Sequence, residues 1–383
     1  MARLGDYIIE YSVKNKENHP YSVYSVTNSN GFCTEYFTKD VSGKNKRTYK
    51  IVPRGYFAYN PSRINVGSID WQSHEDYVIV SPLYTVFKCS EELDKEYLKM
   101  FLKSDYGNQL INANTTGSVR ANLKFEVLSE FKIKMCPLEN QKKIVKEIND
   151  IKKSINLEKH QINLFDELVK ARFVEMFGDP LCNDKKWQMV TINDVGKCVA
   201  GATPSTKKKE YWENGTIPWM SSGEVHKYRI CNTDTKITEE GYKNASTKLV
   251  PPYTVVLAMA GQGKTRGTAG ITEIELCTNQ SICSIVNNER INPWYLLFFL
   301  KLQYKELRNA STCAEGRGGL NLKIIGDFPI MLPSIELQNQ FEAFVKEIDK
   351  SKFVCQNKIK YYQELLEKKM NEYFGEWEKL KAY

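Results

Sequence analysis

The feature that most constrains this chain is an internal duplication. Within the 383 residues, positions 93–103 align without gaps on positions 291–301, an offset of 198. Further blocks recur in the same order at offsets of 197 to 200: residues 50–53 with 248–251, 122–124 with 321–323, 140–141 with 339–340, 145–148 with 345–348, and 177–179 with 374–376. This period is too long for a solenoid repeat. The sequence therefore predicts one large structural unit that occurs twice.

Charge divides each copy into two parts. Residues 1–137 hold 18 Lys and Arg against 15 Asp and Glu, and residues 181–333 hold 19 against 14. The segments 138–180 (8 against 8) and 334–383 (9 against 9) are neutral. A positive excess confined to two domains suits a polyanionic partner. We therefore expect two basic recognition domains, 1–137 and 181–333, with helical segments 138–180 and 334–383.

The neutral segments carry apolar residues at heptad spacing. In the first, they are Ile148, Ile155, Ile162, Val169 and Met176; in the second, they are Val345, Ile348, Ile359, Tyr362 and Leu366. Such a seam with charged flanks is typical of paired long helices. Because a folded domain separates the two segments, the pairing is expected to be an antiparallel coiled coil. The alternative is that each helix packs as an ordinary amphipathic helix on its own domain.

The two basic segments read as mixed α+β domains. Strands are expected over residues 77–87, 253–260 and 281–286, and at 131–137 and 328–333 before the long helices. Helices are expected over 93–105 and 292–308. Gly, Asn, Thr and Ser fill the connections, and parallel winding is not expected. The fold class is therefore α+β, with two such domains, two long helices and a pseudo-twofold internal repeat.

Basic and glycine-rich loops occur at matching places in the two copies. Arg and Lys reach phosphates and base edges, and Gly permits close backbone approach. The candidate DNA-binding residues are Lys44, Lys46, Arg47, Asn60, Arg63 and Arg120 in the first copy, and Lys207, Lys208, Lys209, Gln262, Lys264, Arg266 and Arg317 in the second. The alternative for any one of them is a solvated loop charge.

Two segments resemble catalytic motifs, but each matches its motif only in part. The segment from Gly261 to Thr265 resembles part of a phosphate-binding loop, but Ala258 occupies the position of the first glycine and a glycine-rich stretch follows instead of a helix. A cryptic NTPase that uses Lys264 is therefore ranked third, behind the two non-catalytic hypotheses given below. Asn60-Pro61-Ser62-Arg63 is similar to the Asn-Pro-Pro-aromatic motif of amino-methyltransferases, but its last two residues do not match. Ten scattered Cys and four isolated His predict no metal site, and no hydrolase arrangement stands out.

The sequence shows no apolar run of the ~20 residues that a membrane span needs. The N-terminus lacks the apolar core of a signal peptide. The scattered cysteines are typical of reduced thiols that pack as small core residues. A cytoplasmic protein without a metal centre is therefore expected.

The second copy resembles the target-recognition domain of Type I restriction-modification specificity subunits. The resemblance is carried by Gly201-Ala202-Thr203-Pro204-Ser205, by Tyr211-Trp212, and by residues 215–219, which end in Ile217-Pro218-Trp219. Asn279-Gln280 before a strand, and residues 332–334 leading to 338–340, are similar to later blocks. The first copy lacks the Thr-Pro and Ile-Pro-Trp blocks, which suggests that the two copies read different sequences.

The resemblance implies a non-catalytic subunit. Each globular domain would read one half of a split double-stranded DNA site, and the helices would act as a spacer and dock two methyltransferase subunits. Motor-nuclease (restriction) subunits would join for cleavage. S-adenosylmethionine, ATP and Mg²⁺ would belong to those partners, with no cofactor in this chain. The alternative is a stand-alone duplicated DNA-binding or scaffold protein without a methyltransferase partner.

Overall fold

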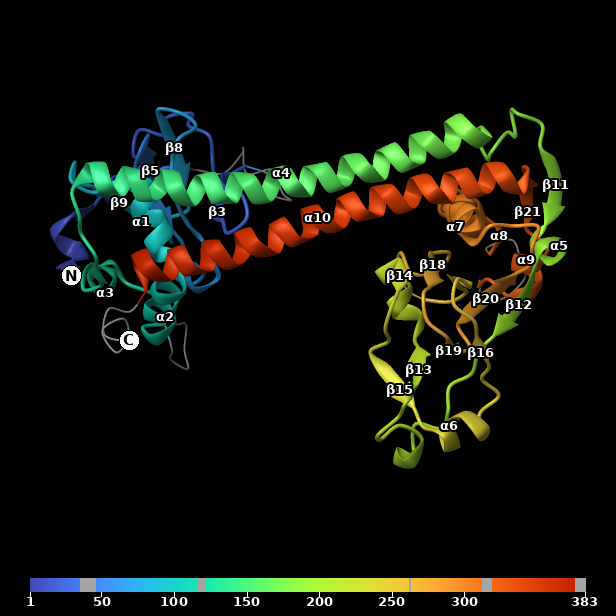
Figure 1. Ribbon diagram of the computed structural model, residues 1–383. Helices are drawn as coiled ribbons and strands as arrows, with labels where there is room; N and C mark the ends of the chain where they lie inside the picture. The colour runs from blue at the N-terminus through green and yellow to red at the C-terminus, as the bar shows by residue number, and fades with distance from the viewer. Residues whose placement is uncertain (35–45, 116–121, 262, 312–318, 376–383) are drawn as a thin grey trace. The chain divides into compact units, whose positions relative to one another are not determined.

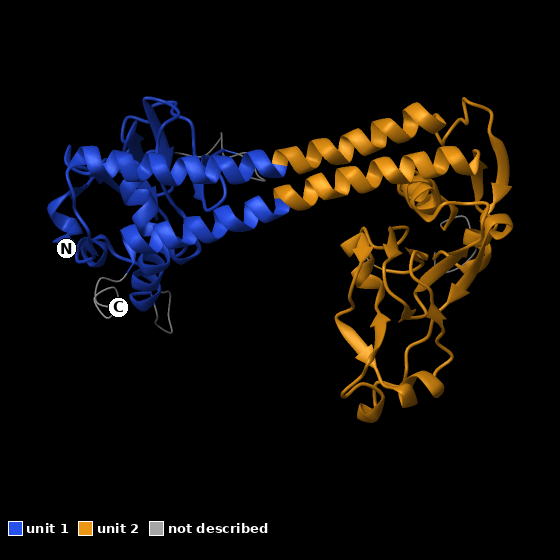
Figure 2. Ribbon diagram, viewed as in Figure 1, with its two compact units in different colours: residues 1–159, 356–383 blue, residues 160–355 orange. Residues whose placement is uncertain are grey.

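The computed structural model describes residues 1–34, 46–115, 122–261, 263–311 and 319–375 (Figure 1). The chain forms two compact units (Figure 2). Unit 1 comprises Met1–Lys159 with Gln356–Tyr383, and unit 2 comprises His160–Cys355. Both units mix helices with mainly antiparallel sheets, so the α+β prediction is confirmed.

Unit 1 is built on a four-stranded antiparallel sheet with the order β2-β9-β6-β7. Its strands are β2 (Ile8–Glu10), β9 (Thr85–Cys89), β6 (Phe57–Tyr59) and β7 (Ile69–Trp71). Three two-stranded sheets accompany it: β1 (Ala2–Arg3) with β10 (Lys132–Ile133), β3 (Ser25–Thr27) with β4 (Gly31–Cys33), and β5 (Lys50–Pro53) with β8 (Tyr77–Val80). The short helices are η1 (Leu4–Asp6), η2 (Ile64–Val66), α1 (Lys95–Leu102), α2 (Asp105–Ala113) and α3 (Phe125–Ser129).

Unit 2 contains a five-stranded sheet with the order β12-β20-β17-β18-β14. Its strands are β12 (Gly196–Ala200), β20 (Ile282–Asn287), β17 (Val255–Ala258), β18 (Ala269–Thr272) and β14 (Arg229–Ile230). A second sheet has the order β15 (Thr235–Ile237), β13 (Ile217–Met220), β19 (Leu276–Thr278) and β16 (Leu249–Val250), and β11 (Gln188–Thr191) pairs with β21 (Pro329–Leu332). The short helices are α5 (Ile192–Val195), η3 (Lys209–Tyr211), η4 (Ser222–Lys227), α6 (Glu239–Lys243), α7 (Pro293–Leu302), α8 (Tyr304–Ala310) and α9 (Leu322–Gly326).

The duplication is visible in the topology. The order β2-β9-β6-β7 in unit 1 recurs as β12-β20-β17-β18 in unit 2, and α1, α2 and α3 recur as α7, α8 and α9. Single contacts recur as well. The buried Tyr97 hydroxyl donates to the Lys134 carbonyl at 2.7 Å, and Tyr295 does the same to the Met331 carbonyl at 2.9 Å. The two copies therefore share one fold.

Two long helices, α4 (Leu138–Phe177) and α10 (Ile335–Phe374), each run through both units. Forty residues at 1.5 Å each make a helix of about 60 Å. In unit 1, Glu147 pairs with Lys369 at 3.0 Å and Glu158 with Lys358 at 3.1 Å. In unit 2, Asp166 pairs with Lys352 at 2.6 Å. Residue numbers rise along one helix as they fall along the other, so the pairing is antiparallel as predicted.

The seam residues fall on the inward faces of these helices. Ile148, Ile155, Val169, Met176, Val345 and Ile348 are buried, and Ile162, Ile359, Tyr362 and Leu366 are half-buried. Several of them also belong to domain cores: Ile148 lies in the core of unit 1, and Val169, Val345 and Ile348 in that of unit 2. The two packing schemes considered from the sequence therefore coexist, because each helix packs on its partner and on a domain.

Each long helix ends against the other copy's domain. Phe177, at the end of α4, packs on Tyr295 of α7 with ring centroids 4.7 Å apart. Phe374, at the end of α10, packs on Tyr97 of α1 at 5.0 Å. All four rings are buried. The Phe-Gly block that recurs in the sequence lies at this contact. Gly178 follows Phe177 with φ +82°, a left-handed conformation that ends the helix and that glycine favours.

Some expected elements differ in detail. Residues 77–87 form two strands, because the turn at Pro82 and Leu83 separates β8 from β9, which lie in different sheets. The helices expected over 93–105 and 292–308 each break into two, because Ser104 caps α2 and the chain turns at Gln303. Tertiary contacts place these breaks, which apolar periodicity does not reveal.

The two copies correspond at an offset of 197 from Leu123 and Leu320 through α4 and α10. The pairings of residues 122–124 with 321–323, 140–141 with 339–340 and 145–148 with 345–348 are therefore wrong, and Gln141 matches Gln338. Both glutamines are fully buried and donate to the carbonyl five residues earlier. Heptad sequences tolerate such a shift in alignment, because apolar and charged residues recur on every turn.

Candidate DNA-binding interface

In unit 2, the loop that carries Lys264 (residues 259–268, called the Lys264 loop) joins β17 to β18. Side chains of α8 fix its backbone. The Tyr304 hydroxyl donates to the Lys264 carbonyl at 3.0 Å. The Arg308 guanidinium donates to the carbonyls of Gly263 (2.8 Å) and Arg266 (3.2 Å). These bonds hold the loop backbone while the Lys264 side chain stays exposed. Because the loop leads into an antiparallel strand, it lacks the helix N-terminus that a phosphate-binding loop needs.

In unit 1, the equivalent loop joins β6 to β7 and is fixed by its own side chains. Asn60 accepts from the backbone N–H of Ser62 at 3.1 Å, and its own N–H donates to the Ser68 carbonyl at 3.2 Å. Arg63, at the end of this turn, is exposed. The loops that the sequence matched to each other are therefore structural equivalents, but different contacts hold them.

In both units, a residue just after the second glycine-rich segment is bonded to the first loop. The Leu123 N–H donates to the Pro61 carbonyl at 3.1 Å, and the Leu320 N–H donates to the Met259 carbonyl at 3.1 Å. In unit 1, the Ser62 hydroxyl also bonds Asn122 at 2.5 Å. Arg120 and Arg317, on these second loops, lie outside the described residues, as do Lys44 and Gln262. These contacts fix Leu123 and Leu320 beside the first loop of their units.

A third segment joins this cluster in unit 2. The Met259 N–H donates to the Ser281 carbonyl at 2.8 Å, and the Thr203 hydroxyl donates to Gln280 Oε1 at 2.5 Å. A Cβ at Gly201 would collide with the Thr278 carbonyl, so glycine is required for this close approach. The Gly201–Ser205 motif, the turn at Gln280 and the Lys264 loop thus lie together, although they are far apart in the sequence. The sequence did not single out the Thr203–Gln280 pair.

The aromatic blocks of the second copy support the same motif. The Trp219 indole donates to the Ala202 carbonyl at 3.0 Å, and Trp212 donates to the Ser205 carbonyl at 3.1 Å. The two indole rings pack edge to face with centroids 5.1 Å apart. This arrangement explains why Tyr211-Trp212 and Ile217-Pro218-Trp219 accompany the Gly-Thr-Pro block.

The candidate lysines occupy less central positions. Lys207, Lys208 and Lys209 are exposed at the start of η3, which Trp212 ties to Ser205. The Lys208 ammonium donates to the Tyr211 hydroxyl at 2.8 Å, and this bond raises the pKa of Lys208. In unit 1, Lys46 and Arg47 lie before β5, where the Lys46 N–H donates to the Asn18 side chain at 3.3 Å. None of the hydrogen bonds described above connects Lys46 or Arg47 to the Asn60 loop.

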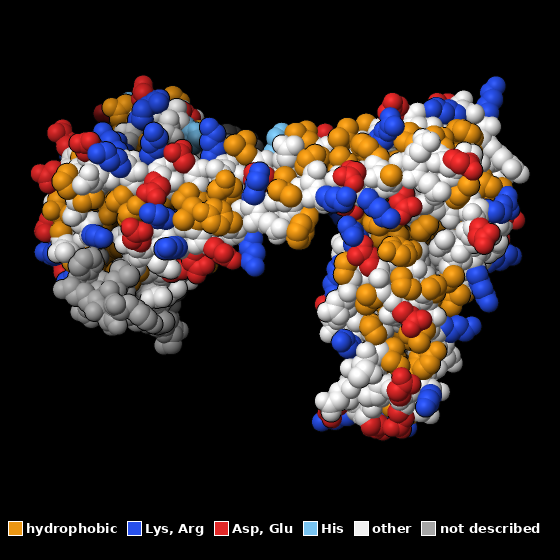
Figure 3. Space-filling model, in the orientation of Figure 1, with side chains coloured by type: hydrophobic (Ala, Val, Ile, Leu, Met, Phe, Trp, Pro, Cys, Tyr) orange, Lys and Arg blue, Asp and Glu red, His pale blue; other side chains and the backbone are white. Residues whose placement is uncertain are grey.

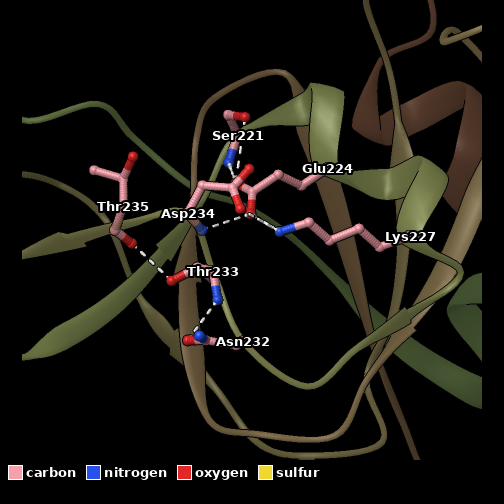
Figure 4. A network of polar contacts seen from close by, with 7 residues as sticks. All are labelled: Ser221, Glu224, Lys227, Asn232, Thr233, Asp234 and Thr235. Atoms are coloured by element: carbon pink, nitrogen blue, oxygen red, sulfur yellow. Dashed lines mark hydrogen bonds and ion pairs between the residues drawn. The ribbon is translucent and has the colours of Figure 1, made fainter. Parts of the chain in front are cut away.

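The buried carboxylate of Glu224 organises η4 (Figure 4). Glu224 accepts from the backbone N–H groups of Ser221 and Asp234, each at 2.9 Å, and pairs with Lys227 at 2.8 Å. Lys227 also pairs with Asp234, which raises the Lys227 pKa. The adjacent His226 imidazole bonds the Thr265 hydroxyl at 3.0 Å. No sequence pattern pairs these residues, because only folding brings them together.

Arg229 connects the unit 2 sheet to α10. Its guanidinium pairs with Glu273 at 2.5 Å and with Asp349 of α10 at 3.2 Å, and it lies over the Trp294 ring. Burial raises the pKa of Asp349, and the Arg229 charge opposes that rise. Folding therefore fixes this domain against the helix with polar as well as apolar contacts.

Within the described ranges, the structure contains no cluster of three metal-ligating side chains. Among those same residues, no helix is long and apolar enough to cross a membrane.

A family model described as the Type I restriction modification DNA specificity domain matches residues 5–164 and 184–361. The specificity subunit of Type I restriction enzyme MjaIX from Methanocaldococcus jannaschii is 30% identical over 201 residues, which cover 50% of this chain and 44% of that protein. The EcoR124I/EcoR124II specificity subunit from Escherichia coli is 25% identical over 199 residues, which cover 51% and 46%. The chain thus aligns with about half the length of these curated relatives.

Two solved structures share the fold. A chain from a study of complex assembly and conformational transition of the type I R-M system superposes with a TM-score of 0.65 at 16% identity, covering 97% of this chain and 96% of that one. The S subunit of a Type-I restriction-modification system from M. genitalium gives 0.58 at 13% identity, covering 96% and 95%.

Proposed function

Because the chain belongs to the family of Type I restriction modification DNA specificity domains, we propose that it is the DNA-recognition subunit of a Type I restriction-modification enzyme. Each globular domain reads one half of a bipartite double-stranded DNA site. The observation that carries the proposal is that both copies of one fold present the loop that follows β6 or β17, tied by equivalent backbone bonds to Leu123 and Leu320.

The loop clusters have the chemistry that DNA reading needs. Lys264 and Arg63 are exposed on loops whose backbones are fixed by hydrogen bonds. Phosphate contacts position a protein on the duplex, whereas side chains at base edges specify the sequence. Fixed backbones favour specificity because the reading groups lose little freedom on binding. The two clusters differ in side chains, so the two half-sites are expected to differ.

The paired helices are the proposed docking surface for two methyltransferase subunits. On α4, Leu164 and Leu168 are 44% and 46% exposed, and on α10 Phe353 and Val354 are 61% and 52% exposed. Figure 3 shows hydrophobic side chains on the exposed face of the long helices. Leu164 and Leu168 are four residues apart and share one face of α4, and exposed apolar side chains of this kind suit partner helices.

The chain itself is proposed to be non-catalytic. S-adenosylmethionine, ATP and Mg²⁺ then act in the methyltransferase and motor-nuclease subunits. A DNA-reading role of this kind places the protein in the cytoplasm. The alternative, a stand-alone DNA-binding or scaffold protein, keeps the two readers but needs no methyltransferase.

Methylome sequencing of a host with and without this gene tests the proposal. The expected result is a bipartite methylated motif that disappears with the gene. Co-purification of a methyltransferase with the full chain separates the main proposal from the stand-alone alternative. A host whose methylome does not change, together with a chain that purifies alone, would contradict the main proposal. Binding of ATP by the wild-type chain that is lost in Lys264→Ala would instead support the NTPase hypothesis.

A further inference from the structure

One turn occupies the same place in both units and carries different exposed side chains. In unit 2 it joins β19 to β20, and the Ile282 N–H donates to the Asn279 carbonyl at 3.3 Å. In unit 1 it joins β8 to β9, and the Tyr84 N–H donates to the Ser81 carbonyl at 3.0 Å. The offset of 198 pairs Gln280 with Pro82, and Ser281 with Leu83.

Both turns lie beside the loop that carries Lys264 in unit 2 or Asn60 in unit 1. The strand register pairs Ala258 with Ile282 in unit 2 and Tyr59 with Thr85 in unit 1, so the turn meets the loop that follows β17 or β6. In unit 2, a backbone bond from Met259 to Ser281 adds to this contact. Pro61 occupies the position of Met259 in unit 1 and has no N–H to donate.

Hydrogen bonds from neighbouring segments fix the backbones of both turns. In unit 2, the Asn279 N–H donates to the Met220 carbonyl at 3.0 Å, and the Asn279 side chain accepts from the Ser281 N–H at 3.1 Å. In unit 1, the half-buried Lys50 ammonium donates to the Tyr84 carbonyl at 2.6 Å. A preorganised backbone lets the exposed side chains select a partner without an ordering cost.

The chemistry of the exposed side chains differs. Gln280 Oε1 already accepts from Thr203, so its amide NH₂ remains available as a donor. Leu83 is 75% exposed at the tip of its turn, where its apolar side chain is accessible to a ligand. In the major groove, an NH₂ donor suits the N7 acceptor of a purine, whereas an apolar group suits the C5-methyl of thymine.

We propose that these equivalent turns are specificity-determining elements, in which Gln280, oriented by Thr203, reads a purine acceptor in one half-site and Leu83 contacts a thymine methyl in the other. This inference rests on the proposed DNA-reading function and assigns it to particular side chains. Gln280 and Leu83 are contact residues, whereas Thr203 is a positioning residue.

The test for Gln280 uses the full chain with the methyltransferase subunits that co-purify with it, and duplexes that carry its methylated site. Each purine of the site is replaced in turn by its 7-deaza analogue, which lacks the N7 acceptor. At one position we expect about tenfold weaker binding by the wild type, and Gln280→Ala should be insensitive to the replacement there. Thr203→Val should reduce the discrimination at that same position only. The control is Gln188→Ala, which removes an exposed glutamine of β11 in the same unit.

The test for Leu83 replaces each thymine by deoxyuridine, which lacks only the methyl group. The wild type should bind one such duplex several-fold more weakly, and Leu83→Ala should no longer distinguish the two bases. Ile9→Ala, at another exposed apolar residue of unit 1, is the matched control. Recognition of the half-site read by the other unit should not change in any variant, and an unchanged midpoint of urea denaturation shows that the substituted unit folds.

Failure of the inference and failure of the proposed function give different results. A wild-type complex without sequence-specific binding would overturn the proposed function. A wild-type complex that binds its site, with variants that retain every 7-deaza and deoxyuridine response, would overturn the inference and leave the function intact.

Discussion

Gln141 and Gln338 fasten each long helix to the domain that precedes it. Gln141 donates to the carbonyls of Glu92 and Cys136, each at 2.8 Å, and accepts from the Asp94 N–H at 2.8 Å. Gln338 makes the same three bonds to Arg290, Pro333 and Asn292. Both side chains are fully buried. A glutamine amide can satisfy two carbonyls and one N–H at once, which explains why this residue type recurs.

Replacing Gln141 by Met should destabilise unit 1 because three partly buried backbone groups lose their partner. A buried group left unsatisfied costs about 1–3 kcal/mol, and water can reach part of this site. The expected loss in free energy of unfolding is therefore about 1–3 kcal/mol, measured by urea denaturation. The exposed neighbour Asn140 provides the control, and Asn140→Ala should change stability by no more than about 0.5 kcal/mol. Equal effects of the two substitutions would contradict the role assigned to Gln141.

Glu147 gives a pH dependence with a defined sign. It accepts from the Tyr373 hydroxyl at 2.6 Å and pairs with Lys369, and these bonds lower its pKa from the ordinary 4.5. A carboxylate with a lowered folded pKa stabilises the fold above its unfolded pKa, and that stabilisation is lost as the pH falls through the folded pKa. The pair contributes at neutral pH and fades below about pH 4.5.

Glu147→Gln should therefore lower the free energy of unfolding at pH 7 by up to about 1 kcal/mol, the range of partly exposed ion pairs. The difference from wild type should shrink in denaturation curves taken at progressively lower pH below 4.5. Glu139→Gln is the control, since Glu139 pairs with Lys143 at 2.9 Å in a more exposed position. A difference that grows on acidification would contradict this assignment.

At the scale of elements, α4 and α10 are defined by their ion pairs as well as by their apolar faces. In unit 1, Glu147 and Glu158 of α4 meet Lys369 and Lys358 of α10. The separation between the two contacts is eleven residues on each helix, so the helices keep one register across this stretch. A change in the length of one helix must therefore be matched in the other.

Inserting four residues after Ser154 of α4 and four after Tyr362 of α10 tests the spacer role. Ser154 and Tyr362 line the same groove of unit 1. Four residues add about 6 Å and slightly more than one turn, which nearly preserves the apolar face. Under the proposed function, methylome sequencing should show a changed gap between unchanged half-sites. The insertion in α4 alone should weaken folding, because it shifts the ion pairs. An unaltered gap in a folded double insertion would count against the spacer.

At the scale of the whole molecule, each unit contains parts of both copies. The core of unit 2 includes Phe173 and Phe177 from α4, and Phe341 and Val345 from α10. A division of the chain into consecutive segments therefore cuts through cores. It follows that a transplanted domain must bring side chains that pack on the resident helices, above all at the position of Tyr295.

Exchanging residues 181–333 for another recognition domain that keeps this aromatic contact should change one half-site only. The physical reason is that the loop cluster of unit 2 lies within the exchanged segment, whereas that of unit 1 lies outside it. Methylome sequencing of a host that carries the exchanged chain is the measurement. If both half-sites changed, the two domains would not be independent readers.

The sequence by itself determined the duplication, the α+β class and the two long antiparallel helices. These features are encoded locally: in block similarity, in heptads such as Ile148, Ile155 and Ile162, and in the glycine stop at Gly178. It also located the equivalent loops at Asn60 and Lys264, because glycine and arginine cluster there.

Only the tertiary structure decided which of these parts meet. Thr203 and Gln280 are 77 residues apart, and neither pattern nor spacing pairs them. Gln141 was matched to the wrong glutamine, because heptad helices look alike at several offsets and a buried hydrogen-bond partner alone distinguishes the right one. Specific contacts between distant segments depend on the folded backbone. The duplicated scaffold could therefore be predicted from the sequence, and the turns that we propose to contact DNA could not.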